Sequence, residues 1–538
     1  MLLRRVFKPL GSSVASAAFL IALMSIASRF LGVVRDRILA SSFGASQTLD
    51  MYYAAFRLPD LVFNLLVLGA LSAGFIPVFA RLVSEENRAA GWRLASNVFN
   101  TLCVFLLVLC GAGIIAAPWL VTIIAPGFPS EARSTIVDLT RIMFLSPFFL
   151  GLSSIVGGML QSFRKFFAYS LAPVLYNVGI IVGALFFAPR FGIVGLAWGV
   201  VLGSFIHVAV QVPSLFKIGF HYQKILDWKD KGLRTMYRMM TARTLGLAIT
   251  QINLTVVTII ASTLPSGSLS VFNLANNLQS FPVGIFGISF AVAVFPILSA
   301  ALTPEAFVSR FSKTFRQIMF CIIPATVGLV ILRAQIVRVI LGAGNFTWQD
   351  TILTVDTVGF FAISLFAQAL IPLLTRGFYS KHDSRTPFFI GLFSDGLNVG
   401  LALWLSRQFG VAGLALAFSL STMLNFLLLF FVLRHRVGGL DEKRLLISTA
   451  KCTAAGLAMA VSIQAMKLLV WPYVNMTKVW GILVQGSLAG LFGLVVYAAV
   501  CSLLKSEEFA ELWQAVKIRL LDSIRGLKSD DQSEVRGI

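Results

Sequence analysis

Long apolar runs separated by short polar segments recur along the whole chain. A transmembrane helix needs about 20 mostly apolar residues, and fourteen segments of the chain meet that requirement. Their expected limits are 14–38, 48–80, 93–121, 135–161, 168–188, 192–215, 238–263, 268–300, 315–340, 351–375, 387–406, 411–433, 446–472 and 479–504. The pattern predicts an all-α polytopic membrane protein with fourteen transmembrane helices.

The distribution of basic residues predicts the orientation of these helices. Lys and Arg gather before the first expected span and after each even-numbered one, as in the segment 217–238, whereas the other loops hold few. Cytoplasmic loops carry the excess of basic residues in membrane proteins, so both termini are expected in the cytoplasm. Arg333 and Arg338, near the outer end of the ninth span, are the main exception.

Composition supports the membrane assignment and excludes other classes. Of the 538 residues, 57% are hydrophobic and only 12% are charged, about half the charged fraction of a soluble domain. The net charge of +21 lies mostly in loops, which indicates membrane orientation and no nucleic-acid partner. The chain lacks the zinc-protease, nucleophile-elbow and phosphate-loop motifs and is not expected to be an enzyme.

An internal repeat divides the chain. The segment 190–197 (RFGIVGLA) reappears as 408–415 (QFGVAGLA), and 176–179 (YNVG) is echoed by 397–400 (LNVG). Each half holds six helices, which is an even number, so both halves enter the membrane from the same side. Such parallel repeats around a central cavity suit alternating access. The expected parts are an N-terminal half (1–216), a basic linker (217–237), a C-terminal half (238–436), helices 13 and 14 (437–505), and a cytoplasmic amphipathic helix and tail (506–538).

Charged residues at membrane depth are concentrated in the first two spans. Each costs about 2.5–3.5 kcal/mol on insertion scales, so Arg29, Arg35 and Arg57 are candidates for the lining of a cavity that binds an anion. A guanidinium group offers forked donors that match phosphate. The alternative is that Arg35, Asp36 and Arg37 form local ion pairs near the outer interface, and the same alternative applies to Arg29 and Arg57.

Later spans hold fewer polar groups. Asp395 and Asn398 lie one helical turn apart in the eleventh span, and their oxygens are candidate ligands for a small cation such as Na⁺. Hydrogen bonding between helices is the alternative role for this pair.

Several motifs resemble the MurJ/MviN family of lipid II flippases, within the MOP exporter superfamily. They are 28–36 (SRFLGVVRD), 43–45 (FGA), 251–253 (QIN), 280–284 (SFPVG), 344–347 (GNFT) and 377–387 (GFYSKHDSRTP), and they cover nearly the whole chain in the expected order. The resemblance implies a protein of the bacterial inner membrane that moves lipid-linked peptidoglycan precursor from the inner to the outer leaflet. No bound cofactor is implied; Na⁺ or H⁺ and the membrane potential are candidates for the driving force.

The resemblance also implies which residues bind the undecaprenyl-diphosphate-linked glycopeptide. The arginines of the family's cationic cavity correspond to Arg29 and Arg35, and an acidic residue at the start of the second helix corresponds to Asp50. Further expected partners are membrane lipids and the peptidoglycan synthesis machinery.

The chain departs from the family pattern at positions that bear on the substrate. Phe63 stands in place of a second-helix arginine, Asn276 and Asn277 replace an Asp-Arg pair, and Ser280 replaces a glutamate. We therefore expect Arg57 to supply the missing charge, with Asn276 and Asn277 as neutral donors. The alternatives are an exporter of another polyprenyl-linked glycan, a multidrug-type exporter, and a membrane transferase. Such a transferase usually needs acidic metal ligands in its loops, and the expected extracellular loops of this chain are short and nearly free of Asp/Glu pairs.

Overall fold

The computed structural model describes residues 14–65, 72–84, 87–514 and 517, and throughout these ranges its regular structure is helical, without strands. The basic N-terminal residues and most of the predicted cytoplasmic tail lie outside the described residues. The helices group into two compact units, of which unit 1 comprises residues 1–278, 340–357 and 391–418, and unit 2 the remaining residues. The predicted division into two six-helix halves stays a prediction.

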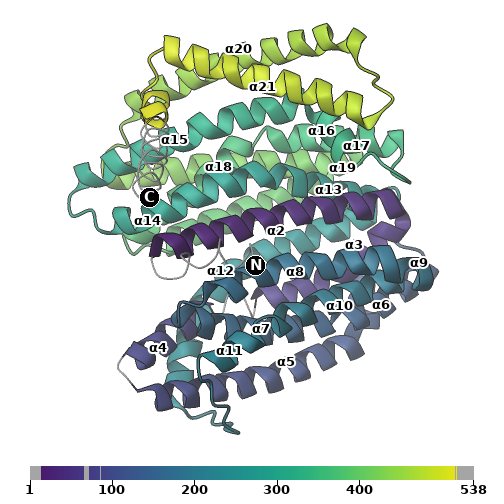
Figure 1. Ribbon diagram of the computed structural model, residues 1–538, viewed down its shortest axis with the longest axis vertical. Helices are drawn as coiled ribbons and strands as arrows, with labels where there is room; N and C mark the ends of the chain where they lie inside the picture. The colour runs from purple at the N-terminus through teal and green to yellow at the C-terminus, as the bar shows by residue number, and fades with distance from the viewer. Residues whose placement is uncertain (1–13, 66–71, 85–86, 515–516, 518–538) are drawn as a thin grey trace, which may run out of the picture. The chain divides into compact units, whose positions relative to one another are not determined.

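Unit 1 holds the N-terminal helices, and Figure 1 labels the α-helices among them. They are α2 (Val14–Phe43), α3 (Gln47–Val62), α4 (Ser72–Ser84), α5 (Arg88–Ile124), α6 (Ser130–Met143), α7 (Leu145–Ser162), α8 (Phe166–Val182), the π-helix η2 (Gly183–Phe187), α9 (Ala188–Phe191), α10 (Ile193–Ala209), α11 (Val212–Lys217) and α12 (Lys231–Ser262).

Unit 2 contains the C-terminal helices, with α20 and α21 packed side by side (Figure 1). Its members are the π-helix η3 (Val283–Ile288), α14 (Ser289–Ser299), α15 (Pro304–Ile331), α16 (Arg333–Ile340), α18 (Leu365–Ser380), α20 (Glu442–Val470), the short η4 (Trp471–Tyr473) and α21 (Val479–Leu503). Four helices contribute residues to both units: α16, through its last residue Ile340, and α13 (Ser268–Pro282), α17 (Trp348–Ala362) and α19 (Arg385–Val437).

Wherever the structure describes them, the predicted spans fall on mainly helical structure. Within the described ranges, nine helices are long and apolar enough to cross a membrane, and α17 with α18, bent by 43°, form a tenth if the pair crosses once. One of the nine, α19, is counted once although it covers two predicted spans. Its 53 residues are interrupted at Gly410, where φ is 58° and ψ is −137°. The predicted total of fourteen spans stays a prediction.

Glycines allow α8, η2 and α10 to pack at backbone contact in unit 1. A Cβ atom on Gly179 would lie 2.2 Å from the Cα of Gly203, and one on Gly183 would lie 2.4 Å from the Cα of Gly199. Small residues at four-residue spacing let membrane helices approach closely, and van der Waals packing then holds them together. This contact fixes the fifth and sixth predicted spans of the chain against each other.

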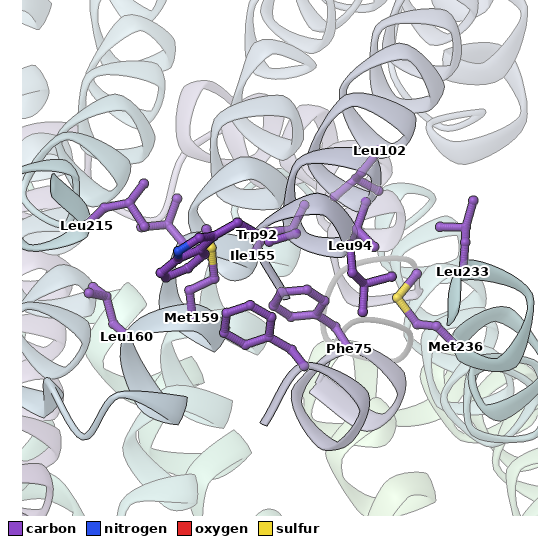
Figure 2. Packing of buried hydrophobic residues seen from close by; sticks show 14 of the residues in the cluster. Phe75, Trp92, Leu94, Leu102, Ile155, Met159, Leu160, Leu215, Leu233 and Met236 are labelled. Atoms are coloured by element: carbon purple, nitrogen blue, oxygen red, sulfur yellow. The ribbon is translucent and has the colours of Figure 1, made fainter. Parts of the chain in front are cut away.

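Each unit has its own apolar core. In unit 1, Figure 2 shows Phe75, Trp92 and Met159 among the buried side chains of one cluster, in which the rings of Phe75 and Phe79 stack with centroids 5.2 Å apart. In unit 2, Cys452, Met459, Ile463 and Cys501 belong to the buried core between α15, α20 and α21. Buried Cys and Met here behave as small or adaptable hydrophobes.

Candidate functional site

A polar pocket of about 190 Å³ lies inside unit 1, among α2, α3, α8, α12 and α13. Its apolar wall includes Phe56, Ile180 and Phe272. Its polar lining consists of Arg35, Tyr52, Tyr53, Arg57, Asp60, Thr258, Asn273 and Asn277. Three predicted binding residues, Arg35, Arg57 and Asn277, therefore meet at one cavity, although they are up to 242 positions apart in the chain.

Arg35 is held in place by two partners. Its Nε and Nη2 atoms donate to Oδ1 of Asp36 at 3.0 and 2.8 Å, and its Nη1 donates to Oδ1 of Asn177 on α8 at 3.1 Å. Asp36 is only 5% exposed, and its other oxygen, Oδ2, accepts a bond of 2.9 Å from Asn277. The local ion pair between Arg35 and Asp36 is thus present, and it occurs within the predicted site.

Arg57 projects from α3 toward α12. Its Nη2 donates to the backbone oxygen of Gln251 at 3.1 Å and to its side-chain Oε1 at 2.7 Å, and its Nε donates to Oγ1 of Thr255 at 3.3 Å. The carboxylate of Asp60, one turn further along α3, lies 3.6 Å from Nη1. Three of the four contacts are to neutral oxygens, so Arg57 is oriented by α12 while its charge is only loosely matched.

The pocket carries less net positive charge than three unpaired arginines along one wall would give it. Arg35 is accompanied by Asp36, and Arg57 by Asp60, so the two pairs are close to neutral together. Arg29 does not line the pocket. It lies six residues before Arg35 on α2 with an exposed side chain, and none of the described residues forms a hydrogen bond or ion pair with it.

Asp50 has a helix-capping contact that the sequence does not reveal. Its carboxylate is 4% exposed and accepts bonds from the backbone amides of Gly267 and Ser270 at 2.6 and 2.7 Å, and from Oγ of Ser270 at 2.6 Å. A carboxylate that accepts amide bonds at a helix start stabilises that end, here the first turn of α13. Asn276 is half-buried on α13 and is not among the pocket's lining residues.

The candidate cation ligands form a hydrogen-bonded group with a residue of α12. Nδ2 of Asn253 donates to Oδ1 of Asp395 at 2.8 Å, and Nδ2 of Asn398 donates to Oδ1 of Asn253 at 3.0 Å. Bonding between helices, the alternative role of the pair, is therefore present. Asn398 is 1% exposed, and its Oδ1 has no hydrogen-bond partner among the described residues, so one oxygen remains available to a ligand.

Several residues of the pocket were not expected from the sequence. Tyr52, Tyr53 and Asp60 line it, and the buried hydroxyl of Tyr53 has no hydrogen-bond partner among the described residues. Asn177 could have been found, because it stands in the repeated segment 176–179. Its counterpart in 397–400 is Asn398. Asn177 hydrogen-bonds to Ser28 and Arg35 on α2, and Asn398 to Asn253 on α12, which are the expected first helices of the two predicted halves.

The fold is shared with helical membrane transporters of known structure. An inward-facing MATE family multidrug transporter of the MOP superfamily matches 77% of this chain and 96% of its own with a TM-score of 0.67 at 18% identity. A structure titled as the lipid II flippase MurJ in an inward closed conformation matches 90% of this chain and 98% of its own, with a TM-score of 0.75 at 24% identity. These likenesses establish that the chain shares its polytopic helical fold with these proteins.

Sequence comparison identifies the family within that class. The family model described as lipid II flippase MurJ matches residues 39–484. A Bdellovibrio bacteriovorus protein named probable lipid II flippase MurJ is 32% identical over 85% of this chain and 89% of its own length. A Burkholderia cenocepacia protein named lipid II flippase MurJ is 30% identical over 77% and 82%. The chain belongs to the lipid II flippase MurJ family.

Proposed function

We propose that this protein is a lipid II flippase, which carries the anionic polyprenyl-diphosphate glycopeptide from the inner to the outer leaflet of a bacterial inner membrane. The observation that carries the proposal is the convergence of Arg35 and Arg57 on one buried pocket, in a chain that belongs to this family. The work is transport by alternating access, and no bond of the substrate is made or broken.

The loose ion pair of Arg57 indicates how an anionic group enters the pocket. Asp60 lies 3.6 Å from Nη1 of Arg57, so a phosphate oxygen can replace that carboxylate without loss of the bonds to Gln251 and Thr255. Charge-assisted bonds from guanidinium to phosphate are short and strong. The amides of Asn273 and Asn277 then serve as neutral donors to phosphate or sugar oxygens.

The size of the pocket fits one stage of a transport cycle. Ligand cavities usually measure roughly 300–1,000 Å³, whereas this pocket measures about 190 Å³. A diphosphate with its attached sugars requires a wider cavity, so helices around the pocket must separate when the substrate binds. Such opening and closing is the motion that alternating access needs.

The driving force is assigned to the membrane potential, with a cation that resets the carrier. Outward movement of negative charge is favoured by a potential that is negative inside, by about 2.3 kcal/mol per charge per 100 mV. Na⁺ is the better candidate than H⁺ for the group of Asp395, Asn253 and Asn398, because Na⁺ prefers oxygen ligands and the buried Oδ1 of Asn398 has no hydrogen-bond partner among the described residues. Collapse of the potential with an ionophore should stop precursor export, whereas ATP depletion at constant potential should not.

A multidrug-type exporter is the second candidate. The observations that favour it are the MATE-like fold and the presence of Asn276 and Asn277 where the family has an Asp-Arg pair. Depletion of the protein separates the two. A lipid-linked peptidoglycan precursor should accumulate on the cytoplasmic side of depleted cells, whereas increased drug sensitivity with normal precursor levels would favour the exporter.

The proposed location is the inner membrane, with both termini in the cytoplasm. The apolar helices and the basic loops support it. Reporter fusions test the orientation: fusions near Lys229 and after Lys505 should report the cytoplasm, and a periplasmic signal at either position would contradict the topology.

A further inference from the structure

A second cavity of unit 1 has none of the polar character of the pocket around Arg57. It is an open groove of about 380 Å³ on α7, η2, α9 and α10, and its lining is entirely apolar. Five of its seven lining residues are aromatic, namely Phe149, Phe187, Phe191, Trp198 and Phe205. Phe191, Trp198 and Phe205 are 65, 46 and 51% exposed, so the hollow opens outward from the helices that form it.

Arg190 is a cationic neighbour of the groove. Arg190 lies three residues after Phe187 and next to Phe191 on the continuous helical path from η2 into α9, and residues three apart on a helix are neighbours on its surface. Its side chain is exposed, and no carboxylate among the described residues pairs with it. The groove therefore combines an apolar hollow with an unpaired positive charge at one end.

The internal repeat shows that the aromatic lining is not a general property of the fold. A shift of 218 residues aligns Arg190 with Gln408, Phe187 with Leu405, Trp198 with Leu416 and Phe205 with Met423. The second copy keeps the turn sequence Phe-Gly and places its arginine one position earlier, at Arg407, but it lacks most of the aromatic side chains. Helix packing alone does not require them, because the second copy forms its helices without them.

We propose that the groove binds an anionic phospholipid of the bilayer, with an acyl chain against the aromatic wall and the phosphate on Arg190. Hydrocarbon chains surround a transmembrane bundle, and they match an apolar lining at no cost in unsatisfied polar groups. Arginine binds phosphate through parallel N–H donors, which adds selectivity for an anionic headgroup. The site is distinct from the pocket at Arg35 and Arg57 and does not depend on which substrate is carried.

Trp198 provides a reporter inside the groove. The full chain is placed in nanodiscs that contain a low fraction of phosphatidylglycerol or phosphatidylethanolamine with brominated acyl chains, which quench nearby tryptophan fluorescence. The contribution of Trp198 is the difference in tryptophan fluorescence between the wild type and Trp198→Phe. We expect brominated phosphatidylglycerol to quench this contribution severalfold more than brominated phosphatidylethanolamine.

Two controls make the result specific. Trp119 on α5 is 67% exposed and has no basic residue within four positions, so its contribution, measured with Trp119→Phe, should be quenched equally by both lipids. Arg190→Gln introduces the residue of the second repeat and should abolish the preference at Trp198. Equal quenching of Trp198 by both lipids, a preference that survives Arg190→Gln, or a Trp198 shielded from both lipids by protein would each overturn the proposal.

Discussion

Arg35 and Asp36 show how one residue pair combines stability with the candidate site. The Asp36 side chain is 7% exposed and that of Arg35 23%, so each charge depends on the other. Removal of one partner from a buried ion pair costs about 3–5 kcal/mol, because the remaining charge is left uncompensated. Loss of activity in an Arg35 variant therefore does not by itself identify a substrate contact.

A double variant separates the two roles of Arg35. Arg35→Ala should lower the thermal unfolding temperature in detergent, because Asp36 stays buried with only the bond from Asn277. Arg35→Ala with Asp36→Asn should recover most of that temperature but should not restore transport in a complementation assay. An Arg35→Ala variant that unfolds at the wild-type temperature would contradict the paired arrangement, and recovery of transport in the double variant would contradict a substrate contact.

Arg57 allows a cleaner test of the guanidinium group. Arg57→Ala should abolish complementation at normal expression, and Arg57→Lys should retain partial activity, because lysine keeps the charge but loses the forked donors to Gln251 and Thr255. Asn277→Ala is the variant for comparison. Asp36 keeps both bonds from Arg35 in this variant, so its defect in complementation should be milder than that of Arg57→Ala. Full activity of Arg57→Ala, or complete loss in Asn277→Ala, would be inconsistent with this distribution of roles.

At the scale of elements, the positions of the helices followed from hydropathy, but their interruptions did not. Apolar runs coincide with the long helices of the described residues, because burial in lipid selects long apolar stretches. The bend between α17 and α18 and the π-helices η2 and η3 depend on packing against neighbouring helices and leave little trace in composition. The repeated Phe-Gly did mark one kind of break, at Gly192 and Gly410.

Replacement of either of these two glycines by alanine should destabilise the protein. Both have positive φ, 61° at Gly192 and 58° at Gly410, which costs an L-residue about 1–3 kcal/mol. A Cβ atom at either position would meet no atom within 4 Å, so the cost is confined to the backbone. Gly192→Ala and Gly410→Ala should lower the unfolding temperature. Gly400→Ala, also in open space but in helical backbone, should not; equal effects at all three positions would contradict a backbone origin.

In unit 2, ion pairs anchor the helical segment 507–514 onto α15 and α20. Arg316, 6% exposed, donates to Glu508 and, at 2.9 Å, to Glu507, which also accepts from Arg444 at 2.8 Å. Burial opposes ionisation of both glutamates, but hydrogen bonds from Ser506 to Glu508 and from Arg444 to Glu507 lower the pKa of each below its usual value. The anchor is therefore built on ionised carboxylates.

Acid should weaken this anchor. A carboxylate whose pKa is lowered on folding stabilises the folded state above its unfolded pKa, and the stabilisation is lost as the pH falls through the folded value. The unfolding temperature should therefore decrease as the pH is lowered below about 4.5, the ordinary pKa of a glutamate. In the variant Glu507→Gln with Glu508→Gln, the temperature should be lower at pH 7 and its acid dependence shallower. Glu511→Gln, in an exposed pair with Lys313, should keep the wild-type dependence; an unchanged profile in the double variant would contradict the anchor.

At the scale of the whole molecule, the sequence predicted the class of protein and part of the site. Arg35 and Arg57 stand out as charged residues at membrane depth and Asn277 as a departure from the family pattern, and the structure brings all three to one pocket. Their partners Asp36 and Asp60 change the charge of that pocket, and the capping role of Asp50 joins residues more than 200 positions apart. Such contacts arise only when the helices pack, so hydropathy and spacing could not predict them.

The central claim, that this chain moves lipid II across the membrane, is tested most directly by the side of the membrane on which the precursor is exposed. Cells that depend on this chain are treated with a membrane-impermeant enzyme that cleaves the diphosphate linkage, and the cleaved precursor is quantified. The account predicts cleavage in cells with the wild-type chain and a cytoplasmic, uncleaved pool after depletion or with Arg57→Ala. Precursor that stays equally accessible from outside after depletion would contradict it.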